Sequence, residues 1–313
     1  MTLPLFDSPP SFDRAKLAQR LRDFSRQGIW IGTSSWKYQG WMDQIYTRDR
    51  YRVRGRFSEK KFQAECLTEY AETFPVVCGD FSFYQFPVPQ FWQSLFTSAP
   101  TSLKFALKVP EEVTAEEFPK HARYGPRAGT TNATYLNAEV LRAQFLQPLE
   151  TYATRIATMI FEFGARGASA RRFVSGLGSM LGQLPDTFRY AVEVRNRQYL
   201  QPAYFDCLRE HRAAHVLNSW SRMPSLPEQM QMADAFTTDF TVVRALLRPG
   251  RQYADAVAQF QPYNQIRDEN PEARESLRIL IRQMREQRRA AYIFVNNRLE
   301  GNAPETIRAV LED

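Results

Sequence analysis

Eight short apolar segments recur along the chain, and stretches with helical periodicity separate most of them. Three of these stretches have apolar residues at spacings of three and four, which is typical of amphipathic helices: 59–74, 138–153 and 272–290. The apolar segments have the length and composition of buried strands: 29–36, 76–83, 104–109, 158–164, 190–196, 214–220, 240–247 and 291–297. Such alternation indicates parallel strands with helical crossovers. Eight units predict an α/β fold, a closed (β/α)₈ TIM-type barrel.

The domain organisation follows from the length and from the loops. A barrel of this class uses about 250 residues as one domain, and the 313-residue chain shows no internal repeat or linker composition. We expect residues 1–28 to contribute a helix that packs on the barrel and residues 29–313 to form the barrel. An open sheet that binds a dinucleotide would need a glycine-rich turn after its first strand, whereas this chain has GTSSWKYQGW there.

The longer connections all follow a strand rather than precede one. In a TIM-type barrel the segments after the strands form the C-terminal face, where active sites are built. The sequence therefore predicts that long loops elaborate this face and that the site lies there. The connections concerned are 37–58, 110–137, 165–170, 221–239 and 248–271.

The composition of the chain limits which cellular compartment and which binding partners we expect for the protein. Cys66, Cys78 and Cys207 form no CxxC pair, so a disulfide framework is not indicated. No stretch approaches the roughly 18 consecutive apolar residues of a membrane helix, and we expect a cytoplasmic protein without a membrane partner. The net charge of +7, with 34 arginines and 7 lysines, is compatible with an anionic ligand.

The fifth predicted strand, AVEVRNR at 191–197, contains two charges that point the same way. Glu193 and Arg195 are two residues apart and so share one face of the strand. Lys108 ends the third strand, Glu162 lies late in the fourth and Arg244 lies in the seventh, so all five can converge. Buried charges persist only where they are paired or used.

Two interpretations of this convergence remain open. In the first, Glu193, Glu162 and Lys108 are catalytic by acid/base chemistry, while Arg195 and Arg244 hold an anionic group. In the second, ion pairs such as Glu193 with Arg195 simply fill the barrel. We also predict substrate contacts from polar and aromatic residues at other strand ends: Trp36, Tyr38, Asp80, Tyr84, Asn296 and Asn297.

No cofactor is predicted. The chain has three histidines, and His211 and His215 lie before or at the start of the sixth strand, away from the expected site. A multi-histidine metal centre is therefore not indicated. An oxygen-rich Mg²⁺ site made by Asp80, Glu162 and Glu193 stays open.

The run RDRYRVRGR at 48–56 has an arginine at every second position. If this run is extended, all five arginines project from one side of the loop after the first strand, which favours binding of phosphate groups. The alternative is an ordinary solvated face. Further arginines in loops of the same face are consistent with an anionic partner: Arg166, Arg171, Arg197, Arg248 and Arg251.

Six segments together resemble a known family. They are IGTSSWKYQGW at 31–41 followed by Tyr46, FY at 83–84, FALKVPEEVT at 105–114, YAVEVRN at 190–196, VVRALLRPG at 242–250 and IFVNNRLEGNA at 293–303. In this order they are similar to the landmarks of the domain of unknown function family 72, also called YecE-like. The resemblance implies a single-domain TIM-type barrel whose activity is not established.

The chain departs from the usual pattern of that family in three places. Cys78 and Asp80 stand where members tend to have a Glu and an Asn, and Glu162 stands where many have a Gln. Leu246 and Leu247 replace a histidine-glycine element. The resemblance therefore implies a divergent or specialised member.

These observations favour an enzyme that acts by acid/base chemistry on an anionic, phosphorylated small molecule. One alternative is a nucleic-acid-binding or nuclease-like protein that uses the arginine run. Another is a glycoside hydrolase with Glu162 and Glu193 as its carboxylates, which requires carboxyl groups about 5–10 Å apart across an open cleft. Direct salt bridges from Lys108 or Arg195 would count against that pair. A barrel that has lost catalysis and serves as a scaffold is a third alternative.

Overall fold

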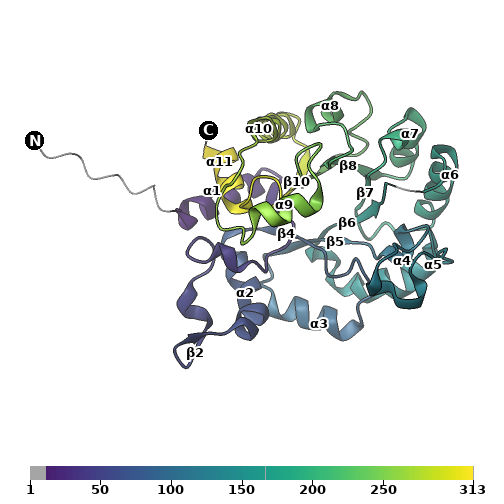
Figure 1. Cartoon of the computed structure of the whole chain (residues 1–313). Coiled ribbons are helices and arrows are strands. Elements are labelled where there is room, and N and C mark those ends of the chain that lie inside the picture. The colour runs from purple at the N-terminus through teal and green to yellow at the C-terminus, as the bar shows by residue number, and fades with distance from the viewer. Residues whose placement is uncertain (1–11, 166, 313) are drawn as a thin grey trace, which may run out of the picture.

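The computed structural model describes residues 12–165 and 167–312, and within them eight parallel strands close into a barrel with helices around it (Figure 1). Neighbouring strands follow the order β1-β10-β9-β8-β7-β6-β5-β4. The predicted fold class is confirmed. The barrel strands are β1 (Ile29–Thr33), β4 (Val76–Gly79), β5 (Lys104–Lys108), β6 (Ile156–Phe163), β7 (Tyr190–Val194), β8 (Ala213–Ser219), β9 (Phe240–Ala245) and β10 (Ala290–Val295).

Every predicted strand segment overlaps one of these strands, and each strand ends one to four residues earlier than predicted. Residues beyond the strand ends remain tied to the sheet by backbone hydrogen bonds. The amide of Arg195 donates to the carbonyl of Phe163 at 3.0 Å, and the amide of Asn296 donates to that of Ala245 at 2.8 Å. Side chains at the upper end of the barrel therefore stand on a fixed backbone.

Helices cover the outside of the barrel, and none of those described has the length and hydropathy needed to cross a membrane. They are α1 (Arg14–Arg26), α2 (Glu59–Thr73), α3 (Pro89–Ser98), α4 (Glu111–Thr114), α5 (Ala138–Leu141), α6 (Ala170–Leu181), α7 (Pro202–Glu210), α8 (Leu226–Gln231), α9 (Tyr253–Phe260), α10 (Pro271–Glu286) and α11 (Ala303–Glu312). Helix α1 contacts β1 and α2. Residues 1–11 of the predicted N-terminal segment lie outside the described residues.

The helix predicted over 138–153 is helical throughout but is not one α-helix. After α5 the chain passes through a π-helical turn, η4 (Arg142–Leu146), into a 3₁₀ segment, η5 (Gln147–Arg155). Pro148 has no amide hydrogen to donate, which interrupts the α-helical ladder at this point. Other 3₁₀ turns lie in the connecting segments: η1 (Gln39–Trp41), η2 (Arg48–Tyr51), η3 (Ala122–Arg127) and η6 (Arg197–Tyr199).

The barrel interior is apolar at its base and charged at its upper end. The apolar part is a cluster of small and branched side chains with four rings: Trp30, Val76, Cys78, Ala106, Ala157, Ile160, Ala191, Ala214, Val216, Phe240, Val242, Tyr292 and Phe294. Val192 and Val194 belong instead to the core between barrel and helices. Because strand side chains alternate, Glu193 points into the barrel, as predicted.

The seam between β1 and β4 closes the barrel. In register, these strands meet only at Thr33 and Val77, and the hydroxyl of Tyr70 bridges the seam. It accepts from the Thr33 amide at 3.1 Å and donates to the Val76 carbonyl at 3.0 Å. Gly32 makes the close approach possible, because a Cβ atom there would lie 1.9 Å from the Val76 carbonyl oxygen.

We predict that Gly32→Ala destabilises the protein, because the strands of the seam must separate to admit the methyl group. Overpacking of this kind costs about 1–3 kcal/mol or more, measurable by urea unfolding. Gly164→Ala is the control, because a Cβ atom at Gly164 would meet no atom within 4 Å. Equal stability of the two variants would contradict this account of closure.

The arginine run at 48–56 is not extended, so the prediction of a one-sided stripe is wrong. The turn η2 comes first, and a hairpin of β2 (Arg52–Val53) and β3 (Arg56–Phe57) follows. Arg54 and Gly55 form its tip with positive φ values of 50° and 78°. A hairpin turns the chain back on itself, so the arginines at its two ends do not continue one row.

Three arginines of this run make local ion pairs. Their partners are carboxylates of the same loop or of α2: Arg48 with Asp43 at 3.5 Å, Arg50 with Glu72 at 2.9 Å and Arg52 with Asp49 at 2.8 Å. Of the further loop arginines, Arg248 and Arg251 both pair with Asp268, and Arg166 lies outside the described residues. Much of the predicted basic surface is thus neutralised locally.

Candidate functional site

The predicted charged residues do converge, and Glu162 is the centre of their network. A single carboxylate oxygen, Oε2 of Glu162, receives three cationic donors from three different strands or strand ends. Lys108 Nζ lies 2.8 Å away, Arg195 Nη2 lies 2.8 Å away and Arg244 Nη1 lies 2.7 Å away. The network therefore joins β5, β6, β7 and β9 across the barrel.

Glu193 is the second carboxylate of the network and is fully buried. Its Oε1 accepts from Arg195 Nε at 3.1 Å, and its Oε2 accepts from Arg244 Nη1. Asp80 lies farther out, 3.7 Å from Lys108 Nζ and 3.8 Å from Arg244 Nη2. Three acidic side chains thus face three basic ones, and the formal charges of the network cancel.

The neighbouring cations determine the ionisation of Glu162. Burial by itself would raise the pKa of this carboxyl group, but the charges of Arg195, Lys108 and Arg244 outweigh burial and hold the pKa well below its ordinary value of 4.5. Glu162 is therefore ionised throughout the physiological range. It cannot be the group that exchanges a proton near neutral pH.

We predict that Glu162→Gln lowers the free energy of unfolding at pH 7 by about 3–5 kcal/mol, because it leaves buried cations without their counter-charge. The folded-state pKa is depressed, so this stabilisation is complete above pH 4.5 and is lost as the pH falls below it. The difference between wild type and variant in urea unfolding should shrink in acid. Glu150→Gln, at an exposed position, is the control. A stability difference between wild type and Glu162→Gln that does not change with pH would contradict the lowered pKa of Glu162.

Aromatic rings hold two of the cations in place. Lys108 Nζ lies 3.5 Å from the centre of the Phe83 ring, and the Arg195 guanidinium lies 3.7 Å from the centre of the Trp220 ring. Such cation–π contacts contribute about 0.5–2 kcal/mol each, more when the pair is shielded from water. These contacts restrict the side chains of Lys108 and Arg195 to orientations in which they pair with the glutamates of the network.

An apolar cluster lies directly after β9. Leu246 and Leu247 belong to it together with Phe260, and Tyr38 and Trp220 pack against it. Arg244 is 2% exposed, so this guanidinium serves the network rather than a ligand that enters from solvent.

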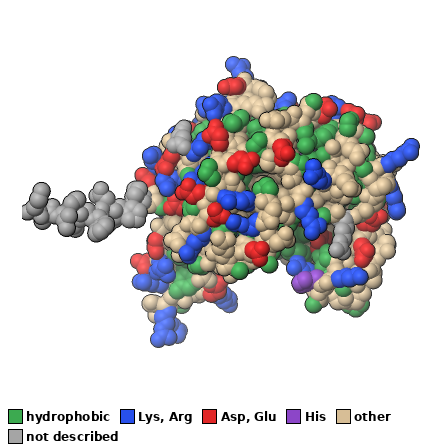
Figure 2. Space-filling model, turned by 45° about the horizontal axis from the view of Figure 1, so that its top comes forward, with side chains coloured by type: hydrophobic (Ala, Val, Ile, Leu, Met, Phe, Trp, Pro, Cys, Tyr) green, Lys and Arg blue, Asp and Glu red, His purple; other side chains and the backbone are tan. Residues whose placement is uncertain are grey.

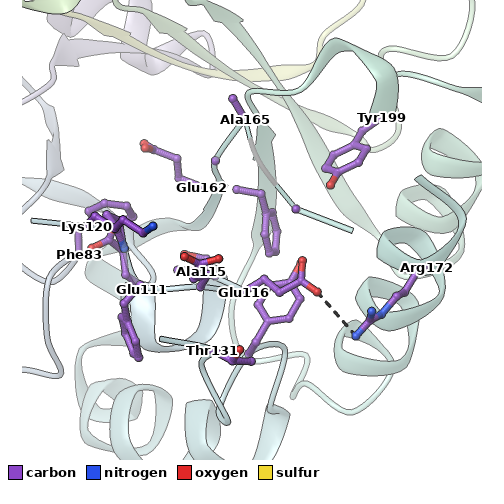
Figure 3. Close-up of a pocket in the computed structure, with 18 residues that line it drawn as sticks. Phe83, Glu111, Ala115, Glu116, Lys120, Thr131, Glu162, Ala165, Arg172 and Tyr199 are labelled. Carbon is purple, nitrogen blue, oxygen red and sulfur yellow. Dashed lines mark ion pairs between the residues drawn. The ribbon is translucent and has the colours of Figure 1, made fainter. Parts of the chain in front are cut away.

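The open pocket lies over β5, β6 and β7. Its volume is about 950 Å³, and its walls come from segments that follow β4, β5, β6 and β7. The face drawn in Figure 2 is hollowed on the right of the view, where acidic, basic and hydrophobic side chains border the depression. Glu162 is the one network residue that lines the pocket (Figure 3).

Glu111 is a second carboxylate of the pocket, and the sequence reasoning did not select it. It begins α4 directly after Pro110 and is half-buried, and its Oε2 accepts from the hydroxyl of Tyr124. Burial raises the pKa of Glu111, although the Tyr124 hydrogen bond and the Lys108 charge oppose the rise. The signals in the sequence are its position after the third strand and its place in FALKVPEEVT, one of the segments that carry the family resemblance.

A model of the family described as protein of unknown function DUF72 matches residues 30–313. The chain belongs to the DUF72 family. The predicted resemblance is therefore confirmed, and the family description assigns no activity.

Solved structures of other DUF72 proteins have the same fold. A member from Thermotoga maritima MSB8 is 20% identical, with a TM-score of 0.62 over 91% of this chain and 99% of that one. A member from Enterococcus faecalis V583 is 16% identical, with a TM-score of 0.61 over 91% and 96% of the respective chains. At these identities the likeness concerns the fold alone. No curated protein matches the chain.

Several residues predicted to contact substrate lie outside the pocket of this DUF72 protein. Trp36 is buried against Phe81. Tyr38 packs on Trp41 and Tyr263, and burial raises its pKa to about 12. These rings contribute to the core around the first loop.

The remaining predicted contacts also have other roles. Asn297 accepts from the Trp41 indole at 3.2 Å and from the Ala303 amide at 2.8 Å, so it joins the first loop to the start of α11. Asn296 accepts from the amide of Arg298 at 2.9 Å. Tyr84 is 46% exposed, and the Arg123 guanidinium lies over its ring. None of these residues lines the pocket.

The described residues contain no group of three or more His, Cys, Asp or Glu side chains arranged to hold a metal ion. Glu162 and Glu193, two of the three residues considered for Mg²⁺, direct oxygens at arginines instead. A cation at this point would have to displace Lys108 or a guanidinium. The carboxylates are thus arranged for ion pairs.

We predict that Tyr124→Phe raises the pKa of Glu111 further, because the lost hydroxyl donates to the ionised carboxylate and favours that form. Titration of the Glu111 carboxyl carbon by NMR, assigned by comparison with Glu111→Gln, measures the change. Tyr253→Phe is the control at an exposed tyrosine. An unchanged or lowered pKa in Tyr124→Phe would refute the contact.

Proposed function

We propose that this DUF72 protein is an enzyme that performs acid/base chemistry on a small polar molecule in the pocket over β5, β6 and β7. One observation carries the proposal: Glu111 and Glu162 line the same pocket, and their surroundings displace their pKa values in opposite directions. Pairs of titratable groups separated in this way are typical of acid/base active sites.

The two carboxyl groups have different roles in this proposal. Glu111 transfers the proton, because a raised pKa brings a carboxyl group closer to the operating pH, where general acid/base catalysis is most efficient. Glu162 stays ionised. Its Oε2 is occupied by three cations, and Glu162 lines the pocket, where its negative charge meets a bound substrate.

Lys108, Arg195 and Arg244 act as positioning residues for Glu162. The prediction of an anionic substrate rested on these three cations, and each of them is engaged by a carboxylate. An anionic group could still meet Lys120 or Arg172, which lie at the exposed rim of the pocket. The network itself gives no preference for an anion.

Glycoside hydrolysis is the second candidate function. The predicted pair of Glu162 and Glu193 is disfavoured, because Glu193 is fully buried, pairs with two arginines and does not line the pocket. The pair of Glu111 and Glu162 instead combines a carboxyl group whose pKa is raised with one that stays ionised. Aromatic side chains in the pocket wall, among them Phe83 and Phe118, suit stacking against sugar rings.

Nucleic-acid binding remains a prediction with less support than before. The arginine run forms a turn and hairpin rather than an extended row, and three of its arginines have acidic partners nearby. Binding through this run would show a steep fall in affinity with added salt.

We predict that Glu111→Gln abolishes turnover while the fold persists. The purified protein is incubated with a metabolite extract and with a panel of glycosides, and mass spectrometry follows which compound is consumed. Loss of a general acid/base lowers the rate about 10²–10⁴-fold. Glu150→Gln should keep wild-type turnover. Wild-type rates in Glu111→Gln would refute the role of Glu111.

A further inference from the structure

We propose that the pocket takes a ligand with a positively charged amino group, so that its substrate class is small organic amines. This deepens the proposed function and rests on it for the choice of pocket. The inference comes from three features of the described lining: where its charges lie, which buried acceptor has no partner, and which rings lie near its carboxylates.

The acidic and the basic residues that line the pocket differ in how deeply they are buried. The described lining residues include four glutamates and two basic residues: Glu111, Glu116, Glu117, Glu162, Lys120 and Arg172. Both basic residues are exposed at the rim, and the side chain of Arg172 is 79% exposed. Three of the glutamates are half-buried or buried. A ligand that enters therefore moves from mixed charge at the rim toward carboxylates inside.

A buried acceptor without a partner lies in the same wall. Thr114 is 3% exposed, and its Oγ1 has no hydrogen-bond partner among the described residues. Glu162 is about nine-tenths buried in this wall, and its ionised carboxylate adds a negative charge there. Buried polar groups are almost always hydrogen-bonded. An ammonium group or a hydroxyl group of a ligand supplies the donor that Thr114 lacks.

Glu116 is the carboxylate best placed to hold a cation. Its Oε1 lies 3.7 Å from Arg172 Nη2, beyond hydrogen-bond distance, and Figure 3 shows the two facing each other across the side of the pocket. Tyr135 and Tyr199 lie beside Glu116, close enough for its charge to help raise their pKa values, which burial raises first. Carboxylate and aromatic rings together suit an organic cation.

Other ligand charges fit less well. An anion would approach three glutamates, of which Glu162 is permanently ionised, and would find the network cations already paired. A neutral polyol could donate to Thr114 and Glu162, but it would leave Glu116 with only an exposed partner at 3.7 Å. An amine supplies both a donor for Thr114 and a positive charge for Glu116.

Binding of matched probes tests the inference without any need for turnover. Isothermal titration calorimetry compares putrescine with 1,4-butanediol, its neutral analogue of similar length, and with inorganic phosphate. We expect putrescine to bind the wild-type protein with a Kd of about 1 mM or below, more weakly at high salt. The diol and phosphate should show no binding in the same range.

Two variants with opposite expected effects locate the site. Glu116→Gln should weaken putrescine binding about fivefold or more, and Glu116→Asp should restore part of it. Arg172→Gln should strengthen binding, because it removes the cation that competes for Glu116. Glu150→Gln and Arg171→Gln carry the same changes in net charge at exposed positions and should leave the Kd unchanged.

The inference is overturned if putrescine does not bind, if the diol or phosphate binds as tightly, or if Arg172→Gln weakens the binding of putrescine. It is also overturned if Glu116→Gln matches Glu150→Gln while thermal unfolding shows both to be folded. Its failure is distinct from failure of the proposed function. Putrescine binding lost in Glu116→Gln, with turnover unaffected in Glu111→Gln, would leave the amine site standing and remove the catalytic role of Glu111.

Discussion

One carboxylate oxygen that accepts three cationic donors is the interaction on which the upper barrel depends. Lys108, Arg195 and Arg244 come from β5, from the end of β7 and from β9, and all reach Oε2 of Glu162. None of these charges would be tolerated alone in a barrel interior, because removing a single ion from water costs several kcal/mol. The network is neutral as a whole, so a closed barrel can hold it.

The same network determines where chemistry is possible. It holds Glu162 ionised and engages the cations that an anionic substrate would need. The open volume is lined by Glu162 and by Glu111, whose pKa is raised. Glu162, which stays ionised, thus lines the same pocket as Glu111, whose raised pKa suits it to proton transfer.

Much of the fold could be predicted because its signals are local. Strand β7 illustrates this: the alternation in AVEVRNR places Glu193 and Arg195 inside the barrel, and the structure agrees. The prediction for the arginine run used the same kind of local signal, and it was wrong. Its alternation is real, but Arg54 and Gly55 adopt positive φ values and turn the chain into a hairpin. Glu111 escaped notice because nothing in PEEVT distinguishes a half-buried glutamate from an exposed one.

The sequence by itself determined the barrel, the face that carries the long loops and the set of charged residues at the strand ends, since periodicity and order along the chain specify all three. Only the tertiary structure decided which charges neutralise one another, that Arg244 is buried, and that the pocket opens beside Glu111 and Glu116. The physical reason is that burial and Coulomb interactions depend on distances between side chains from different strands. Those distances exist only after the barrel has closed.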